Sequence, residues 1–206
     1  MIKAGSEAME KDRMVNKKSI VDIYRTIRHS LLFDISIMII CCVAGVFAKK
    51  LINPFANMIT DAIHIPGGIS TAVSLCFLVI ARGITTRKWS ASVMGASQAL
   101  VAIAIGSFGS MGILMPFAYV VPGIVIDLVM LIPENGLFLT RMKAFLANIL
   151  SSVSAALFAD IVVFHLPLQP LLVYLGVSAL SGAICGFAAG IIIESFNKLT
   201  RGDESE

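Results

Sequence analysis

Long apolar runs joined by short polar connections constrain this sequence more than any other feature. The first run, LLFDISIMIICCVAGVFA at residues 31–48, contains one charged residue, Asp34, and ends at Lys49-Lys50. A helix needs roughly 20 mostly apolar residues to cross the hydrocarbon core of a bilayer. Of the 206 residues, 57% are hydrophobic and only 14% are charged, and the mean hydropathy is +0.90. Such a composition excludes an ordinary soluble domain and predicts an all-α, polytopic membrane protein.

Six apolar segments are candidates for transmembrane helices, namely 31–48, 69–84, 91–106, 113–132, 145–164 and 171–196. We predict that they form a six-helix bundle over residues 31–197, preceded by a basic N-terminal segment at 1–30 and followed by a polar tail at 198–206. The stretch at 51–68 is interrupted by two prolines and a Gly-Gly pair. These residues favour turns, so we predict a structured loop there.

Lys and Arg residues divide unequally between the two sides of this bundle. The N-terminal segment, the connections at 82–90 and 133–144, and the tail hold almost all of them, whereas only Lys49 and Lys50 fall on the other side. Because cytoplasmic loops carry the excess of Lys and Arg, both termini are predicted to be cytoplasmic. The basic residues form no patch interleaved with aromatic residues, so no nucleic-acid partner is expected. The predicted outer loops are 51–68, 107–112 and 165–170.

Motifs of catalysis and metal binding are absent from the sequence. It contains no HExxH, no GxSxG and no phosphate-binding loop of the Walker type. The four cysteines lie inside apolar runs, without CxxC or paired Cys/His spacing, where a thiol acts as a small apolar side chain. We therefore predict no catalytic residue, no cofactor and no metal site.

Several polar side chains lie toward the predicted outer side. An ionised group near the centre of a bilayer costs about 2.5–3.5 kcal/mol on insertion scales, so it needs a partner or a cavity. Asp160, near the outer end of the fifth predicted helix, falls on the same side as Asp61 and His64 of the first outer loop. We predict that these three residues share a pocket. Polar tips on otherwise apolar helices, which suit a site for a planar, partly polar molecule, are offered by Gln98, Tyr119 and Tyr174.

Other charged residues within the apolar runs admit a structural role. Asp34, Arg82 and Glu194 lie near the ends of their runs, so we predict that they reach the headgroup region. Asp127 lies deeper, one to two helical turns from the inner end of the fourth predicted helix. For Asp127, a structural hydrogen bond or ion pair and a contact with a ligand remain equally open.

Short motifs along the chain suggest a family. AGVFA at 44–48 is followed by IPGGIST at 65–71, ARG at 81–83, MGASQAL at 94–100 and VPGIVIDL at 121–128. In their order, and with six short helices, inner termini and a Pro/Gly-rich first outer loop, they resemble the substrate-binding S component of an energy-coupling factor transporter. The similarity is to S components grouped with uptake of thiamine precursors and related vitamins, and it covers most of residues 31–197.

This resemblance implies capture of a ligand without chemistry, in the plasma membrane of a prokaryote. A small vitamin or precursor would bind in the outer half, the loaded protein would dock on a transmembrane coupling subunit, and partner ATPases would drive release. Ala44 and Ala48 match the small-residue pattern that S components present to the coupling subunit. The positions that match the family's substrate site are Asn57, Asp61, His64, Tyr119, Asp160 and Tyr174.

The charge of the ligand follows from the residues expected around it. Acidic groups in an aromatic-lined pocket favour a neutral or cationic heterocycle, such as a pyrimidine or a thiamine-like molecule. In the outer half, the only basic residues are Lys49 and Lys50. If either lysine turned inward, the preference would reverse toward an anion.

Three other classes of function remain open. In an ion-coupled transporter or small channel, Asp127 and Asp160 would relay ions, and transport would need no ATPase partner. In a structural or assembly protein, the aspartates would only pair with other helices, and no ligand would stabilise the fold. A membrane enzyme would depend on Asp/His pairs.

Overall fold

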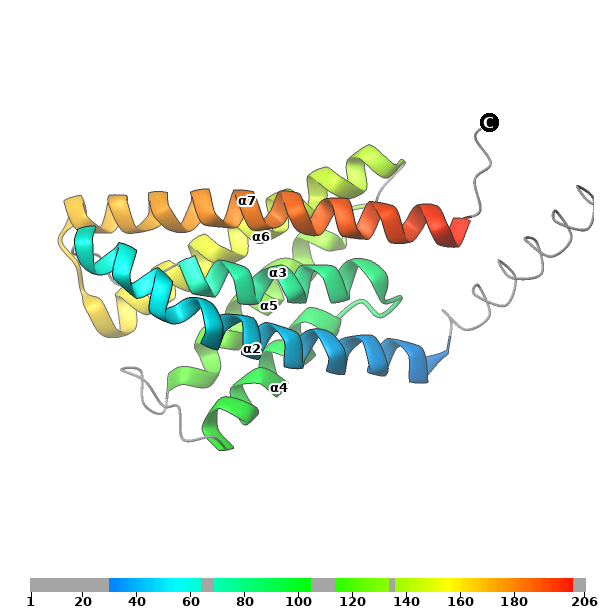
Figure 1. The fold of residues 1–206 in the computed structure, drawn as a ribbon, viewed down its shortest axis with the longest axis horizontal. Coiled ribbons are helices and arrows are strands. Elements are labelled where there is room, and N and C mark those ends of the chain that lie inside the picture. Colours follow the sequence, from blue (N-terminus) through cyan, green and yellow to red (C-terminus); the bar gives the residue numbers. More distant parts are fainter. Residues whose placement is uncertain (1–29, 64–68, 105–113, 134–135, 202–206) are drawn as a thin grey trace, which may run out of the picture.

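The computed structural model describes residues 30–63, 69–104, 114–133 and 136–201. This part of the chain is all-helical, with six α-helices and one π-helical turn (Figure 1). The elements are α2 (Leu31–Ile63), α3 (Ile69–Ile84), α4 (Ser90–Ala104), α5 (Met115–Met130), α6 (Leu137–Ala159), the π-helical η2 (Asp160–Phe164) and α7 (Leu168–Arg201). The all-α class predicted from the apolar runs is confirmed.

The first helix is longer than predicted. α2 continues through Pro54 to Ile63, so the loop prediction is wrong for residues 51–63, and residues 64–68 lie outside the described part. Proline removes one backbone donor and disfavours a helix in water. In an apolar environment, however, a non-helical backbone leaves many N–H and C=O groups without hydrogen bonds. A helix that loses one hydrogen bond at proline is therefore lower in free energy than a loop there. With 33 residues, α2 is about 50 Å long.

The fifth helix, α6, also begins earlier than predicted. α6 starts at Leu137, within the stretch at 133–144 that was predicted to be a connection. Its two basic residues have partners on neighbouring elements: Arg141 forms an ion pair with Glu194 at 2.6 Å, and Lys143 donates to the carbonyl oxygen of Met130 at 3.2 Å. Because these charges are satisfied within the bundle, the helix includes them.

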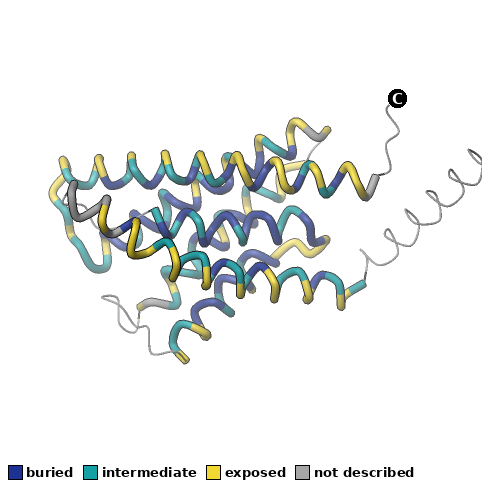
Figure 2. Tube along the Cα trace, in the orientation of Figure 1, coloured by how far each residue is buried: buried dark blue, intermediate teal, exposed yellow. Residues whose placement is uncertain are grey.

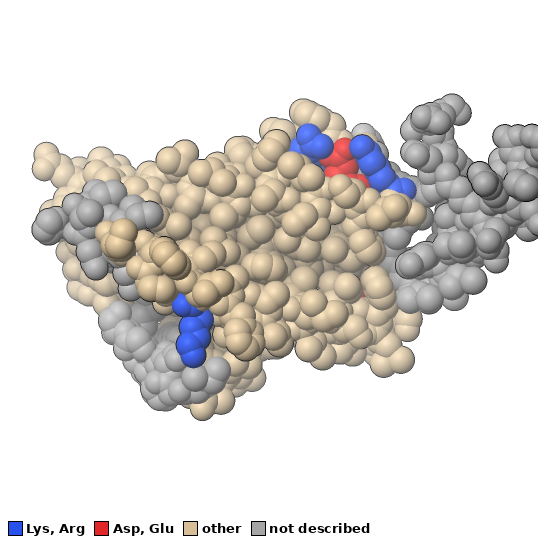
Figure 3. Space-filling view, viewed as in Figure 1, with Lys and Arg blue, Asp and Glu red and all other residues tan. Residues whose placement is uncertain are grey.

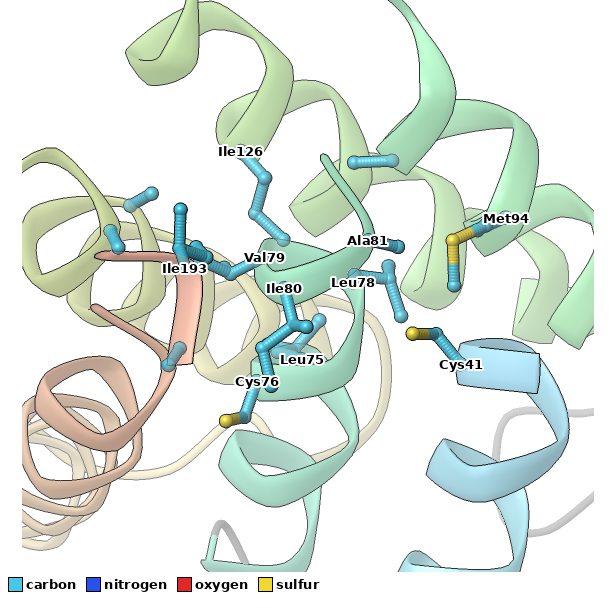
Figure 4. Packing of buried hydrophobic residues seen from close by; sticks show 14 of the residues in the cluster. Cys41, Leu75, Cys76, Leu78, Val79, Ile80, Ala81, Met94, Ile126 and Ile193 are labelled. Carbon is cyan, nitrogen blue, oxygen red and sulfur yellow. The ribbon is translucent and has the colours of Figure 1, made fainter. Parts of the chain in front are cut away.

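α3 lies at the centre of the bundle and packs against each of the other five α-helices. In Figure 4, Val79 of α3 lies beside Ile193 of α7, whereas Leu78 of α3 lies near Met94 of α4 and Cys41 of α2. Figure 2 shows the resulting pattern, with buried residues lining the interior and exposed residues on the outer faces. The core is therefore organised around one short helix.

Large apolar side chains cover the outside of this bundle. Phe47 and Leu51 on α2 are 69% and 71% exposed, and Leu180 and Ile184 on α7 are 66% and 67% exposed. Figure 3 shows a broad uncharged face, with Asp and Glu beside Lys and Arg at its upper right and a patch of Lys or Arg alone at its lower left. An apolar surface of this extent marks contact with a membrane or a partner rather than with water.

Helix length supports the same conclusion. Three helical segments are long and apolar enough to span a membrane: Leu31–Ala56, Phe138–Phe164 and Leu168–Leu199. Three shorter apolar helices, Ile69–Ile84, Ser90–Ala104 and Pro116–Met130, accompany them. The chain is a helical protein suited to association with a membrane.

Candidate functional site

The segments that hold the predicted site residues meet at one end of the bundle. The last turns of α2, the start of α5 and the turn between η2 and α7 lie at the same end (Figure 1). The backbone of Asn57 and Asp61 belongs to α2, but their side chains, like the whole of His64, lie outside the described residues. The site can therefore be built from Tyr119, Asp160 and Tyr174.

Asp160 opens the π-helical turn η2, where the backbone departs from the α-helical hydrogen-bonding pattern. Its side chain is buried, and its Oδ1 accepts a hydrogen bond from the backbone N–H of Leu166 at 2.8 Å. Its carbonyl oxygen accepts from the N–H of His165 at 2.8 Å, and His165 ends the turn in the left-handed conformation, with φ 47°. π-helical turns occur frequently at functional sites. Here the turn places the Asp160 carboxylate beside the connection between η2 and α7.

Tyr174 lies beside the same connection between η2 and α7. It is buried and packs with Ala156, Phe164 and Leu166, and its ring meets Phe164 edge to face with centroids 6.2 Å apart. Leu166 thus packs against the cluster of Ala156 and Tyr174, and its backbone N–H bonds to Asp160. Asp160 and Tyr174 therefore both lie beside Leu166, and whether they share a ligand pocket stays a prediction.

Tyr119 belongs to a second polar group, with a partner that was not among the predicted site residues. Lys49 Nζ donates to Tyr119 Oη at 3.2 Å and lies 4.8 Å from the centroid of the ring, within the range of a cation–π interaction. Among the described residues, no hydrogen bond, ion pair or ring contact joins Tyr119 directly to Asp160 or Tyr174. The predicted residues thus form two groups at one end of the bundle.

Comparison of the chain with protein-family models, with curated proteins and with solved structures finds no match. The likeness to S components therefore rests on the sequence motifs alone and is a hypothesis. Within the described residues, no group of three or more His, Cys, Asp or Glu side chains is arranged to hold a metal ion.

The sequence left the role of Asp127 open, and in the structure its carboxylate is held by contacts with α3 and α4. It is fully buried, and its carboxylate accepts from the N–H of Ala91 at 3.3 Å and from the N–H and hydroxyl of Ser92 at 2.8 and 2.6 Å. Arg82 Nε lies 3.0 Å from its Oδ1. A carboxylate at the first N–H groups of a helix satisfies donors that have no partner within the helix. Asp127 therefore caps α4 and ties α3, α4 and α5 together.

Asp34, Arg82 and Glu194, predicted to reach the headgroup region, have partners within the bundle. Asp34 is buried and accepts from the N–H and hydroxyl of Thr86 at 3.2 and 2.9 Å, and the Arg82 side chain is only 11% exposed beside Asp127. Glu194 forms ion pairs with Arg141 and with Lys198. Tertiary partners hold these charges in the bundle.

Ala44 and Ala48, predicted to face a coupling subunit, are half-buried on α2. On α2, Gly45 lies close to the neighbouring helices, since an added Cβ would lie 3.0 Å from Gln98 Nε2 and 3.5 Å from the carbonyl oxygen of Ser74. The adjoining face of α2 is open and apolar, with Val43 and Phe47 exposed. This face is available to lipid or to another membrane protein.

Proposed function

We propose that this protein is the membrane-embedded, substrate-binding subunit of an energy-coupling factor transporter. The observation that carries the proposal is the pair of polar groups, Lys49 with Tyr119 and Asp160 with Tyr174, at one end of an otherwise apolar helical bundle. Polar side chains in such a setting are costly unless they serve a partner or a ligand. The ligand proposed is a small heterocyclic vitamin or vitamin precursor.

The proposal includes six spans with both termini in the cytoplasm of a prokaryote and the two polar groups facing outward. The short helices α3, α4 and α5, with 16, 15 and 16 residues, are about 22–24 Å long. Helices of that length match a bilayer that thins locally around them. The excess of Lys and Arg at the opposite end supports the inward orientation of that end.

In the proposed mechanism, the protein binds its ligand and carries out no reaction. Segments near the end of α2 close over the ligand, and the loaded protein docks on a transmembrane coupling subunit through the face of α2 that carries Ala44 and Ala48. ATP hydrolysis in partner subunits then drives release on the inner side. The ion-coupled alternative would use Asp127 and Asp160 as relays, and four contacts within 3.3 Å already engage the Asp127 carboxylate.

A thermal-shift screen of the purified protein in detergent tests ligand binding. The compounds are thiamine, its pyrimidine precursor, the other B vitamins, haem, cobalamin and divalent metals. A ligand present at a hundred times its Kd adds about 2.7 kcal/mol of stability, so one compound is expected to raise Tm clearly. Asp160→Asn is expected to reduce this shift, because the substitution removes the charge beside Tyr174.

Glu194→Gln is the matched control, since it neutralises a carboxylate near the other end of α7, paired there with Arg141 and Lys198. This variant should keep the full ligand-dependent shift. Equal loss of the shift in both variants would assign the effect to general destabilisation. A protein that none of the compounds stabilises would contradict the proposed binding function.

A further inference from the structure

Lys49 of α2 contacts Tyr119 of α5, and Gln98 of α4 packs against α2 one helical turn before Lys49. We call these three residues the donor cluster. Lys49 Nζ contacts both the hydroxyl and the ring of Tyr119. Gln98 Nε2 would lie 3.0 Å from a Cβ on Gly45, which precedes Lys49 by one helical turn on the same face of α2. The members of the donor cluster thus come from three neighbouring helices, with Gln98 and Lys49 one helical turn apart along α2.

Close backbone packing between α4 and α5 relates Gln98 to Tyr119. A Cβ added to Gly95 would lie 2.5 Å from the carbonyl oxygen of Tyr119, so only glycine permits this approach. Gly95 precedes Gln98 by three residues, which places both on one face of α4. The position of Gln98 relative to Tyr119 is therefore fixed by tight helix packing.

The unused hydrogen-bonding capacity of the cluster consists of donors. Gln98 is 1% exposed, and its Nε2 has no hydrogen-bond partner among the described residues. An ammonium group has three N–H donors, and among the described residues Lys49 donates one hydrogen bond, to Tyr119. Tyr119 accepts that bond, which leaves its own hydroxyl proton free to donate.

The charge of the cluster is also unbalanced. Lys49 forms no ion pair with a carboxylate of the described residues, whereas Asp34, Asp127 and Glu194 each have a basic partner within 4.0 Å. A half-buried cation inside an apolar span is costly without a counter-charge. Neighbouring donors with one unpaired positive charge are complementary to a carboxylate.

We infer that the donor cluster binds a carboxylate group of the transported ligand. The inference rests on the proposed function and names the chemical class of its substrate: a small heterocyclic molecule that carries a carboxylate. Lys49 turns inward, which is the condition under which the sequence-based preference for a neutral or cationic ligand reverses. The carboxylate would accept from Lys49 Nζ, Gln98 Nε2 and the Tyr119 hydroxyl.

The experiment compares pairs of compounds that differ only in the carboxylate. Nicotinate with nicotinamide, and biotin with biotinamide, are titrated into the full-length protein in detergent, beside thiamine and its pyrimidine precursor. The acid of one pair is expected to bind, and its neutral partner to bind at least about tenfold more weakly, because a charge-assisted hydrogen bond is lost.

Variants then assign the effect to the donor cluster. Lys49→Gln is expected to raise the Kd of that acid by about 10- to 100-fold, and Lys49→Arg by less, because it keeps the charge. Gln98→Met, which removes the amide donors at similar size, should raise the Kd by about 3- to 10-fold. Lys50→Gln is the matched control on the neighbouring, exposed residue and should leave the Kd unchanged.

Two outcomes would overturn the inference while the proposed function stands. In the first, a neutral or cationic compound binds, no acid does, and Lys49→Gln leaves its Kd unchanged. In the second, phosphatidylglycerol stabilises the wild type but not Lys49→Gln, while the acids do not bind, which assigns the cluster to a lipid phosphate. A failure of the proposed function is distinct, because then no compound of either class binds.

Discussion

Replacing Asp127 with alanine is expected to lower the free energy of unfolding by about 3–5 kcal/mol, the usual result of removing one partner of a buried ion pair. The substitution leaves Arg82 beside a cavity with no counter-charge, and it removes the acceptor for the first N–H groups of α4. The measurement is thermal or SDS-induced unfolding of the purified protein in detergent.

Asp127→Asn separates the two contributions. It keeps an oxygen that can accept from Ala91 or Ser92 but removes the charge that pairs with Arg82, so its loss of stability should be smaller. If Asp127→Ala unfolds at the same temperature as the wild type, the capping role is wrong. A variant that loses ligand binding at unchanged stability would show that Asp127 contacts the ligand.

Replacing Gly186 with valine is expected to cost about 2–3 kcal/mol of stability, toward the upper end of the range for overpacking. Gly182, Gly186 and Gly190 of α7 form a seam against α6. A Cβ at Gly186 would lie 2.9 Å from the carbonyl oxygen of Phe145 and 2.9 Å from the Cβ of Asn148. Neither atom can rotate away, so the two helices would have to separate.

Gly176→Ala on the same helix is the matched control, because nothing lies within 4 Å of a Cβ there. Alanine favours a helix over glycine by up to about 1 kcal/mol, so this variant should be as stable as the wild type or slightly more stable. Both variants are compared in one unfolding assay in detergent. Equal stability of Gly186→Val and Gly176→Ala would show that the α6–α7 seam is looser than the structure has it.

Apolar runs predict helices well in this chain but predict their ends poorly. The segment at 69–84 was predicted with the bounds that α3 has, because both of its ends coincide with a clear change in polarity. The extension of α2 through Pro54 was missed, because the turn preference of proline and glycine is a property of chains in water. The early start of α6 was missed because Arg141 depends on Glu194, 53 residues further along the chain.

The candidate site was predicted in part for a similar reason. Residue type and predicted side of the membrane grouped Asp160 with Asp61 and His64, whose side chains lie outside the described residues. The resemblance added Tyr174, which lies with Asp160 beside Leu166. The inward direction of Lys49 depends on how α2 packs through Gly45 against α3 and α4, which no local pattern records. Asp127 likewise received its role from α4, 35 residues before it in the chain.

Uptake that depends on partner ATPases is the most direct test of the proposed transporter subunit. The radiolabelled compound that stabilises the protein is supplied to cells that express the chain alone, with a coupling module, or with a coupling module whose ATPases are inactivated. We predict accumulation only with the active module, and its loss in Lys49→Gln but not in Lys50→Gln. Accumulation by the chain alone, abolished by a proton ionophore, would contradict the account and identify an ion-coupled transporter.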